Sequence, residues 1–165
     1  MKTGKTMKEI SKERLKEIAE FRLPSYKEIP DVGLYLDQTA KYINECLKTF
    51  ESYGLTNSMI SNYVKQKIIS NPVKKQYYRD QIASLLFIVL TKNVLSLDKI
   101  NTILELKNID TQDFYTEFSK IFEDTLHKVF NKENLKLNRD DILNDVIITS
   151  VYQIYLNERM KYLEK

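Results

Sequence analysis

The chain has 165 residues, of which 42% are hydrophobic and 30% are charged, and its net charge is +3. This length is enough for one good core or for two small domains, and it excludes two unrelated large ones. A single cysteine excludes an internal disulfide bond, and no apolar run approaches the roughly 20 residues that span a bilayer. We therefore expect a cytoplasmic protein with no membrane segment. Only three glycines and three prolines are present, and the predicted fold class is all-α.

The first region of the chain, residues 1–21, is predicted to be an N-terminal arm or a weakly amphipathic helix. Pro24 and Pro30 bracket an irregular stretch after it. Pro30 suits the first turn of a helix, because that turn does not use the N–H group that proline lacks. We therefore expect the next helix to begin near Pro30.

A long helix and a short one are predicted next, with a glycine between them. Apolar residues recur at spacings of three and four, which predicts a helix from about Val32 to Ser52, and Gly54 is expected to end it. Thr56 is a suitable N-cap for a short helix that runs to about Val64. This succession is the plan of a helix-turn-helix, whose second helix enters the major groove of DNA.

The short helix presents small polar side chains that are able to hydrogen-bond to base edges. Residues 54–79 include five basic residues and no acidic one, which leaves 21 basic and 23 acidic residues elsewhere. The lysines of this segment are expected to bind phosphates and to fix the register on DNA. The candidate DNA-binding residues are Thr56, Asn57, Ser58, Ser61, Asn62, Tyr63, Lys65, Lys67, Lys74 and Lys75. The alternative is a solvated polar face with lysines that only keep the protein soluble.

The rest of the chain is predicted to form a loop and then further helices. An Asn-Pro pair interrupts the helical periodicity of residues 65–78, which predicts a loop or wing there. Residues 81–90 are apolar almost all round, as expected of a helix that is buried on several sides. Ser96 and Asp110 are suitable caps for the two helices that follow.

The last predicted helix carries apolar residues on more than one face between residues 142 and 156. A terminal helix of this kind is often a subunit contact across a two-fold axis. One hypothesis is therefore a homodimer through the C-terminal helices, which places two reading helices about 34–36 Å apart. The other is that this helix is simply the centre of the core. The C-terminal helices are also compatible with an apolar cavity for a small apolar effector.

The residues required for an enzyme or a metal site are poorly represented. His127 is the only histidine, and Glu123 and Asp124 precede it by four and three residues. Carboxylate-bridged metal sites in bundles need a histidine from each of two helices. A Ser-His-Asp site would need the same histidine, and no nucleophile elbow, Walker loop or dinucleotide fingerprint is present. Cys46 lies on the apolar stripe of its helix. We expect no enzyme activity, no cofactor and no metal.

Four segments of the chain resemble one bacterial family. They are PDVGLYLDQ (30–38), LTNSMISNYVKQKII (55–69), NPVKKQYYRDQIASL (71–85) and VLSLDKI (94–100). The chain is identified by these ordered blocks as a member of the family catalogued as domain of unknown function 1836 (YkrK-like). The resemblance covers roughly residues 22 to 106.

The middle of that region also resembles, more loosely, the winged helix-turn-helix of the MerR superfamily. The resemblance implies that residues 56–64 form the reading helix, 65–78 the wing and 78–90 the next helix. It also implies that Asn57, Ser58, Ser61, Asn62 and Tyr63 face DNA, with Lys65, Lys67, Lys74 and Lys75 on its backbone. The long predicted first helix departs from that superfamily, as do the C-terminal residues, which lack its single coiled coil and its metal-sensing cysteines.

The sequence thus predicts an arm (1–21), a helix-turn-helix DNA-binding domain (22–106) and a helical dimerisation or effector-binding region (107–165). The predicted function is a sequence-specific transcriptional regulator of double-stranded DNA. Repression is expected over activation, because repression requires only binding. The alternative is a non-enzymatic helical adaptor that binds another protein. Charge reversal in the basic segment separates the two, because only a regulator loses DNA affinity.

Overall fold

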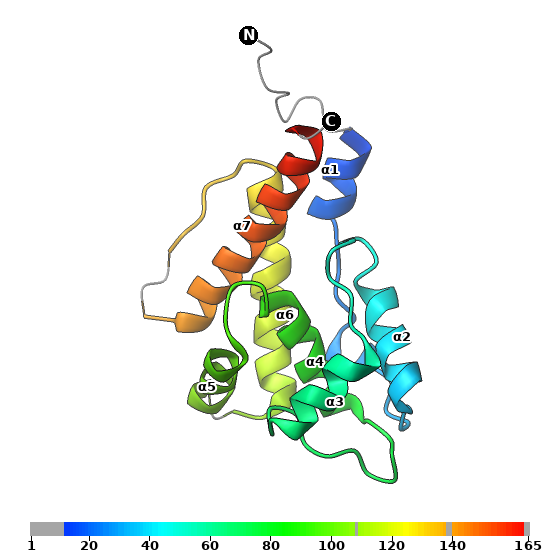
Figure 1. Ribbon diagram of the computed structural model, residues 1–165. Helices are drawn as coiled ribbons and strands as arrows, with labels where there is room; N and C mark the ends of the chain where they lie inside the picture. The colour runs from blue at the N-terminus through cyan, green and yellow to red at the C-terminus, as the bar shows by residue number, and fades with distance from the viewer. Residues whose placement is uncertain (1–11, 108, 138–139, 164–165) are drawn as a thin grey trace.

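The computed structural model describes residues 12–107, 109–137 and 140–163, so residues 1–11 of the predicted arm lie outside it (Figure 1). The elements are α1 (Lys12–Ala19), η2 (a 3-10 turn, Tyr26–Glu28), α2 (Leu36–Cys46), α3 (Asn57–Lys65), α4 (Arg79–Thr91), α5 (Leu97–Lys107), α6 (Thr111–Phe130) and α7 (Ile142–Leu163). The predicted all-α class is confirmed. Among the helices of the described ranges, none combines the length and the apolar character needed to cross a membrane.

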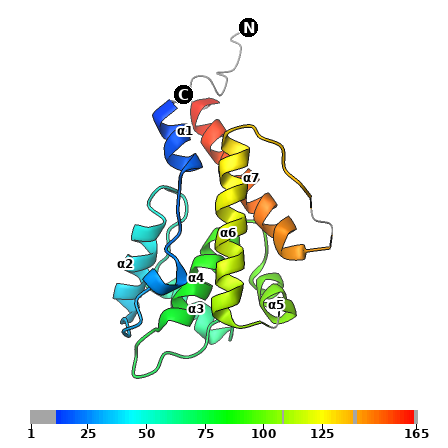
Figure 2. The ribbon, with the colours of Figure 1, turned by 180° about the vertical axis from the view of Figure 1, so that it is seen from behind.

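The helices are arranged along the two long helices α6 and α7. These two lie side by side and run in the same direction, since the segment that joins them returns along the outside of the molecule (Figures 1 and 2). Helix α1 lies beside their C-terminal ends, whereas α3 and the loop after it lie at the opposite end of the molecule. The candidate DNA-binding residues are therefore remote from both α1 and the end of α7.

Helix α4 is the centre of the core. Its residues from Gln81 to Thr91 are buried except Ser84, which agrees with the prediction for residues 81–90. Phe87 packs edge-on between Phe114 and Phe118 of α6, with ring centroids 5.0 and 5.1 Å apart. One continuous hydrophobic cluster extends from α1 to α7. The predicted DNA-binding domain (22–106) and the predicted C-terminal region (107–165) therefore share a single core.

The predicted long helix from about Val32 to Ser52 is wrong at both ends. Helix α2 begins only at Leu36, because the chain before it is held extended by an antiparallel bridge between Leu34 and Tyr77. The N–H of each of these two residues donates to the carbonyl of the other, at 2.9 and 2.7 Å. Val32 is consequently 66% exposed, and Pro30 is not in the first turn of a helix.

The helix also ends early, at Cys46. The chain continues in turns, in which the N–H of Phe50 donates to Leu47 and that of Tyr53 donates to Phe50. These turns bury Leu47, Phe50 and Tyr53 at the spacing of three that a helix would also have produced. Apolar spacing alone does not separate the two conformations, which is why the sequence predicts one long helix.

Candidate nucleic-acid interface

Helix α3 begins where its N-cap predicts. The hydroxyl of Thr56 accepts a hydrogen bond from the N–H of Met59 at 3.1 Å, so it satisfies one of the free donors of the first turn. Ile60 and Tyr63 lie on the inner face of the helix, at 0% and 4% exposure. The predicted N-cap is confirmed, and the helix ends at Lys65, one residue beyond the expected end.

Most of the predicted residues of α3 lie on its exposed side. They are Asn57, Ser58, Ser61, Asn62 and Lys65, with Thr56 exposed at the cap. Tyr63 is the exception, and its prediction as a DNA-facing residue is wrong. It lies three residues after Ile60 and hence on the same buried face of the helix. Burial raises the pKa of its hydroxyl.

The connection between α2 and α3 is fixed by side chains. The amide of Asn44 donates to the carbonyl of Leu55 at 2.9 Å and accepts from its N–H at 2.7 Å. The ammonium group of Lys92, in the turn after α4, donates to the carbonyl of Gly54 at 3.0 Å. Gly54 does not have a positive φ, and a Cβ there would meet nothing within 4 Å. The turn is thus not one that requires glycine.

The C-terminal end of α3 carries Lys67 in a left-handed conformation, with φ of 60°. The N–H of Lys67 donates to Val64 at 2.9 Å, and the N–H of Ile68 donates to Tyr63 at 3.0 Å. This pair of hydrogen bonds is a Schellman motif, and glycine is the usual residue at the left-handed position. The side chain of Lys67 is exposed at the end of the helix.

A tight turn follows, formed by Val73, Lys74, Lys75 and Gln76, and we name it the Lys74–Lys75 turn. Val73 and Gln76 each donate to the other's carbonyl, at 3.0 and 2.9 Å, which makes a two-residue hairpin connection. Lys74 and Lys75 have φ of 51° and 65°. Two-residue turns with positive φ at both central residues normally contain Asn-Gly, because a side chain is strained there. The predicted loop or wing at residues 65–78 thus contains an ordered turn that projects two lysines.

Gly33 is a residue of this site that the sequence analysis missed. A Cβ at Gly33 would lie 2.6 Å from Oε1 and 2.7 Å from Cβ of Gln76, so only glycine allows the two segments to approach. The approach sets the Leu34–Tyr77 bridge, which connects the Lys74–Lys75 turn to the start of α2. A glycine inside an extended segment is a known signal of close backbone approach, and it was available in the sequence.

The lysines of the site differ from its arginine in their partners. Lys65, Lys67, Lys74 and Lys75 are exposed, and none forms an ion pair with a residue in the described ranges. Arg79 instead donates to the backbone carbonyls of Ile29 and Lys27, at 2.8 and 3.1 Å. The four lysines are therefore free to bind an external anion, whereas Arg79 holds the segment before α2 against α4.

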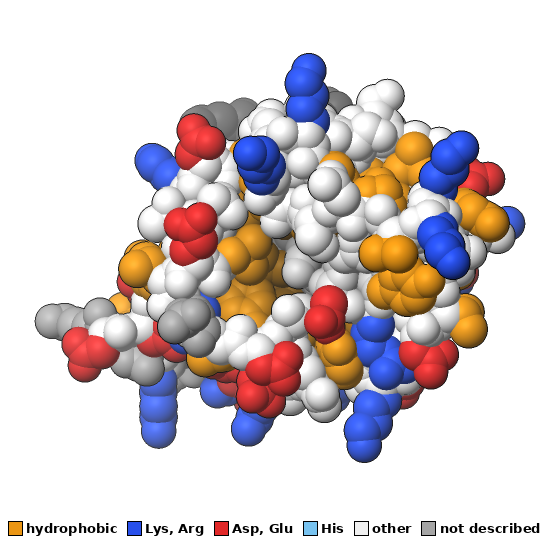
Figure 3. All heavy atoms as spheres, turned by 90° about the horizontal axis from the view of Figure 1, so that it is seen from below, with side chains coloured by type: hydrophobic (Ala, Val, Ile, Leu, Met, Phe, Trp, Pro, Cys, Tyr) orange, Lys and Arg blue, Asp and Glu red, His pale blue; other side chains and the backbone are white. Residues whose placement is uncertain are grey.

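Figure 3 views the end of the molecule that carries α3 and the Lys74–Lys75 turn. Lysine and arginine side chains project from this face, and apolar side chains are exposed between them. Acidic side chains are also present around the face. The lack of acidic residues is thus a property of residues 54–79 and not of the whole end of the molecule, so a polyanion would have to approach through α3 and the turn.

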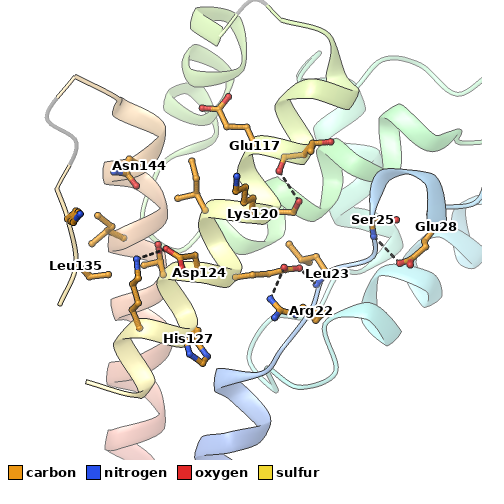
Figure 4. A pocket seen from close by; sticks show the side chains of 18 residues that line it. Arg22, Leu23, Ser25, Glu28, Glu117, Lys120, Asp124, His127, Leu135 and Asn144 are labelled. Carbon is orange, nitrogen blue, oxygen red and sulfur yellow. Dashed lines mark hydrogen bonds and ion pairs between the residues drawn. The ribbon is translucent and has the colours of Figure 1, made fainter. Parts of the chain in front are cut away.

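A groove of about 1040 Å³ runs along α6, between the segment before η2 and the start of α7 (Figure 4). Its lining combines charged side chains, among them Glu117, Lys120 and Lys128, with apolar ones such as Leu23 and Ile148. The lining is of mixed character, whereas a small apolar effector was expected to occupy an apolar cavity, so this effector stays a prediction.

Glu123 and Asp124, the acidic residues that precede His127, line this groove and bind separate partners. Glu123 accepts from the N–H of Leu23 at 2.8 Å and from Arg22 at 3.0 Å, and Asp124 pairs with Lys128 at 2.9 Å. In the described part of the chain, no three His, Cys, Asp or Glu residues are placed to hold a metal ion.

Comparison with known proteins gives one result that concerns identity. No curated protein and no solved structure matches the chain. The looser resemblance to the MerR superfamily has no support from these comparisons and stays a prediction. A family model matches residues 24–125, which include the α2–α3 unit, the Lys74–Lys75 turn, α4 and most of α6. The chain belongs to this family, which is described as Domain of unknown function (DUF1836).

Proposed function

We propose that this chain is a sequence-specific DNA-binding protein that regulates transcription and reads the major groove of double-stranded DNA with α3. The helix is short, capped and held by Asn44 and Lys92, so its exposed side chains have a fixed placement. Major-groove readers use such a helix, with the residues near its N-terminus against base edges. Asn57, Ser58 and Ser61 occupy these positions.

The observation that carries the proposal is the backbone conformation of the lysines. Lys67, Lys74 and Lys75 all have positive φ, where a side chain costs about 1–2 kcal/mol relative to glycine. None of them gains an ion pair with a described residue in return. Local strain of this kind typically accompanies function. Phosphate binding is the use that fits three exposed ammonium groups beside a reading helix.

Asn57 is the best candidate for base recognition. Its side chain has no hydrogen-bond partner among the described residues, so its carbonyl and its amino group are both available to an adenine edge. Asn62 already accepts a hydrogen bond from Gln66 at 3.1 Å. We infer that Asn57 contributes more to base discrimination than Asn62.

Repression is the mode of regulation that we propose, because occlusion of a promoter needs only binding. The resemblance of residues 56–90 to a MerR-like winged helix-turn-helix supports the same assignment at the level of analogy. The Lys74–Lys75 turn would take the place of the wing tip.

The test is an affinity titration against duplex fragments from the upstream region of the protein's own gene, at two salt concentrations, with a random duplex of equal length alongside. We expect the Lys74→Glu/Lys75→Glu variant to bind much more weakly and to lower the salt slope by about 2, because two phosphate contacts are lost. Asn57→Ala should instead reduce the preference for one fragment with little change in the slope.

Lys132→Glu is the matched control. Lys132 is also a lysine at positive φ, with φ of 56°, but it lies at the C-terminal end of α6. It should not affect DNA binding. If wild-type protein binds no fragment, or binds weakly in a way that the charge-reversed variant shares, the proposal is wrong, and the non-enzymatic protein-binding adaptor becomes the better assignment.

A further inference from the structure

Helix α7 lies on the surface and is apolar on two opposite faces. Its inner face packs on α6 and α4 through Leu143, Ile147, Val151 and Ile154, none of which is more than 2% exposed. The exposed residues of α7 are Ile142, Asp145, Thr149, Tyr152, Leu156, Arg159, Met160 and Leu163. A helix that is apolar all round is normally covered all round. Among the described residues, none covers the side of α7 that faces away from α6 and α4.

The exposed residues form a single stripe. They follow one another at intervals of three or four, apart from the adjacent pair Arg159 and Met160, so they share one side of the helix. Tyr152 and Leu156, at the middle of the stripe, are 49% and 52% exposed. Ile142 and Leu163, at its two ends, are 49% and 47% exposed. A stripe about 33 Å long, the length of 22 helical residues, is therefore open to solvent, and five of its eight exposed residues are apolar.

The stripe is symmetric in its chemistry about Tyr152. Asp145 and Arg159 lie seven residues before and after it, and they carry opposite charges. Ile142 and Leu163 lie ten residues before and eleven after it, and both are apolar. An antiparallel copy of the same helix, centred near Tyr152, thus places each charge opposite its complement and each apolar end opposite another apolar end.

We propose that two copies of this chain associate through antiparallel pairing of their α7 helices across a two-fold axis near Tyr152. Neither Asp145 nor Arg159 forms an ion pair within the described chain, and Arg159 lies over the ring of Tyr155, 6.0 Å from its centroid. A parallel pair would set Asp145 against Asp145 and Arg159 against Arg159. Both arrangements are compatible with a two-fold axis, but opposite charges meet only in the antiparallel one.

This inference does not depend on DNA binding. Where the proposed function also holds, the axis relates two α3 helices by a two-fold rotation, as a near-palindromic site requires. Self-association is measured without DNA, so failure of either proposal is recognised separately from the other.

The first test is the oligomeric state of the full chain by sedimentation equilibrium at micromolar concentration. Wild type is expected to be a dimer, and Leu156→Glu is expected to weaken the dimer by roughly 100-fold, because the substitution occurs in both copies at the centre of the contact. Leu156 is exposed, so the variant should fold normally, as circular dichroism will check. A monomeric wild type, or a dimer that Leu156→Glu leaves unchanged, would overturn the proposal.

A charge exchange tests the direction of pairing. Asp145→Arg and Arg159→Asp should each weaken the dimer about tenfold, because each creates like-charge pairs at both ends of the interface. The double variant should restore most of the affinity. Residues 145 and 159 lie about 21 Å apart along one helix, so restoration cannot come from contact within a chain. Failure of the double variant to restore association would contradict antiparallel pairing.

Two controls complete this experiment. Asp98→Arg on α5 removes an acidic residue from the first turn of a different helix, as Asp145→Arg does for α7, and it should leave the dimer intact. In a Cys46→Ser background, Tyr152→Cys should form a disulfide-linked dimer on oxidation because the two copies meet there, whereas Leu163→Cys should not. Cross-linking at residue 163 as well as at 152 would indicate parallel helices, in which each residue faces its own copy, and would overturn the proposal.

Discussion

At the end of the molecule where α1 meets α7, Arg14 and Lys161 both bind the carboxylate of Glu158, which is 4% exposed. Arg14 reaches it at 2.7 Å and Lys161 at 3.0 Å, and Arg14 also donates to the carbonyl of Thr49 at 2.8 Å. At the other end, Lys74 and Lys75 have no carboxylate within an ion-pair distance among the described residues, and they occupy strained backbone positions. Arg14 and Lys161 thus stabilise the fold at the first end, whereas Lys74 and Lys75 make no such contact at the second.

The comparison suggests how to separate stability from binding by mutation. Removing a charge near Glu158 should lower the free energy of unfolding and leave the surface of α3 unchanged. Removing a charge from the Lys74–Lys75 turn should weaken DNA binding and should not lower the free energy of unfolding. The following experiments test this difference, from the largest expected effect to the smallest.

Glu158→Gln is expected to have the largest effect. It removes the buried carboxylate that Arg14 and Lys161 share, so the free energy of unfolding should fall by about 2–3 kcal/mol in urea titration. Glu45→Gln is the matched control, because Glu45 pairs with Lys48 at 2.6 Å with both side chains about 70% exposed. Its effect should be far smaller than that of Glu158→Gln, because water screens an exposed pair. Equal effects of the two substitutions would mean that burial of Glu158 does not matter.

Lys74→Asn/Lys75→Gly is expected to change affinity and stability in opposite directions. DNA affinity should fall roughly 10- to 30-fold through the loss of two phosphate contacts. The free energy of unfolding should rise by about 1 kcal/mol, because Asn-Gly suits a turn with two positive φ values. Lys132→Gly relieves the same kind of strain far from α3, so it should stabilise without changing affinity. If the turn variant is less stable than wild type, the claim that Lys74 and Lys75 are strained in this turn is wrong.

The two glycines near the site should respond differently to alanine. Gly33→Ala forces the backbone away from Gln76 and should destabilise by about 1–2 kcal/mol, with weaker DNA binding because the Lys74–Lys75 turn moves. Gly54→Ala meets no atom within 4 Å and should change stability by less than about 0.5 kcal/mol. Thermal unfolding of the pair measures this. A tolerated Gly33→Ala would show that the turn does not depend on this approach.

The smallest expected effect is a difference in pH dependence. Burial by itself would raise the pKa of Glu158, but hydrogen bonds from Arg14 and Lys161 outweigh it and hold the pKa below its ordinary value. A carboxyl group with a depressed folded-state pKa stabilises the fold above its unfolded pKa, and this contribution is lost as the pH falls through the folded pKa. Wild type should therefore lose more stability on acidification than Glu158→Gln does. Parallel curves for the two proteins in urea titrations from neutral to acidic pH would contradict this.

Much of the helical fold could be predicted from the sequence, because it follows from local chemistry. Thr56, Ser96 and Asp110 cap helices as expected, since a cap needs only a side-chain oxygen and the next few N–H groups. The buried character of α4 was also evident, because a helix that is apolar all round can be covered only by neighbours on several sides. The absence of acidic residues among these lysines is a property of the sequence itself, so it needed no structure to be recognised.

The long-range contacts could not be predicted in this way. Tyr63 shows the difference: its spacing from Ile60 places it toward the inner side of α3, but only the packing of α3 on α2 shows that it is buried and not at the rim of a DNA-facing surface. The start of α2 depends on the pairing of Leu34 with Tyr77, more than 40 residues away in the chain. No local pattern reports such a partner, so apolar spacing extended the predicted helix in both directions.

The sequence by itself determined that this chain is helical, where its caps lie and where its uncompensated positive charge is concentrated, because these depend on neighbouring residues. Only the tertiary structure decided which lysines are strained, why Gly33 is required and which face of α7 is left open. Those features depend on the approach of distant segments. The backbone conformation of Lys74 and Lys75 is set by a hairpin that a bridge to Leu34 holds in place, and the exposure of α7 is set by what α6 and α4 cover.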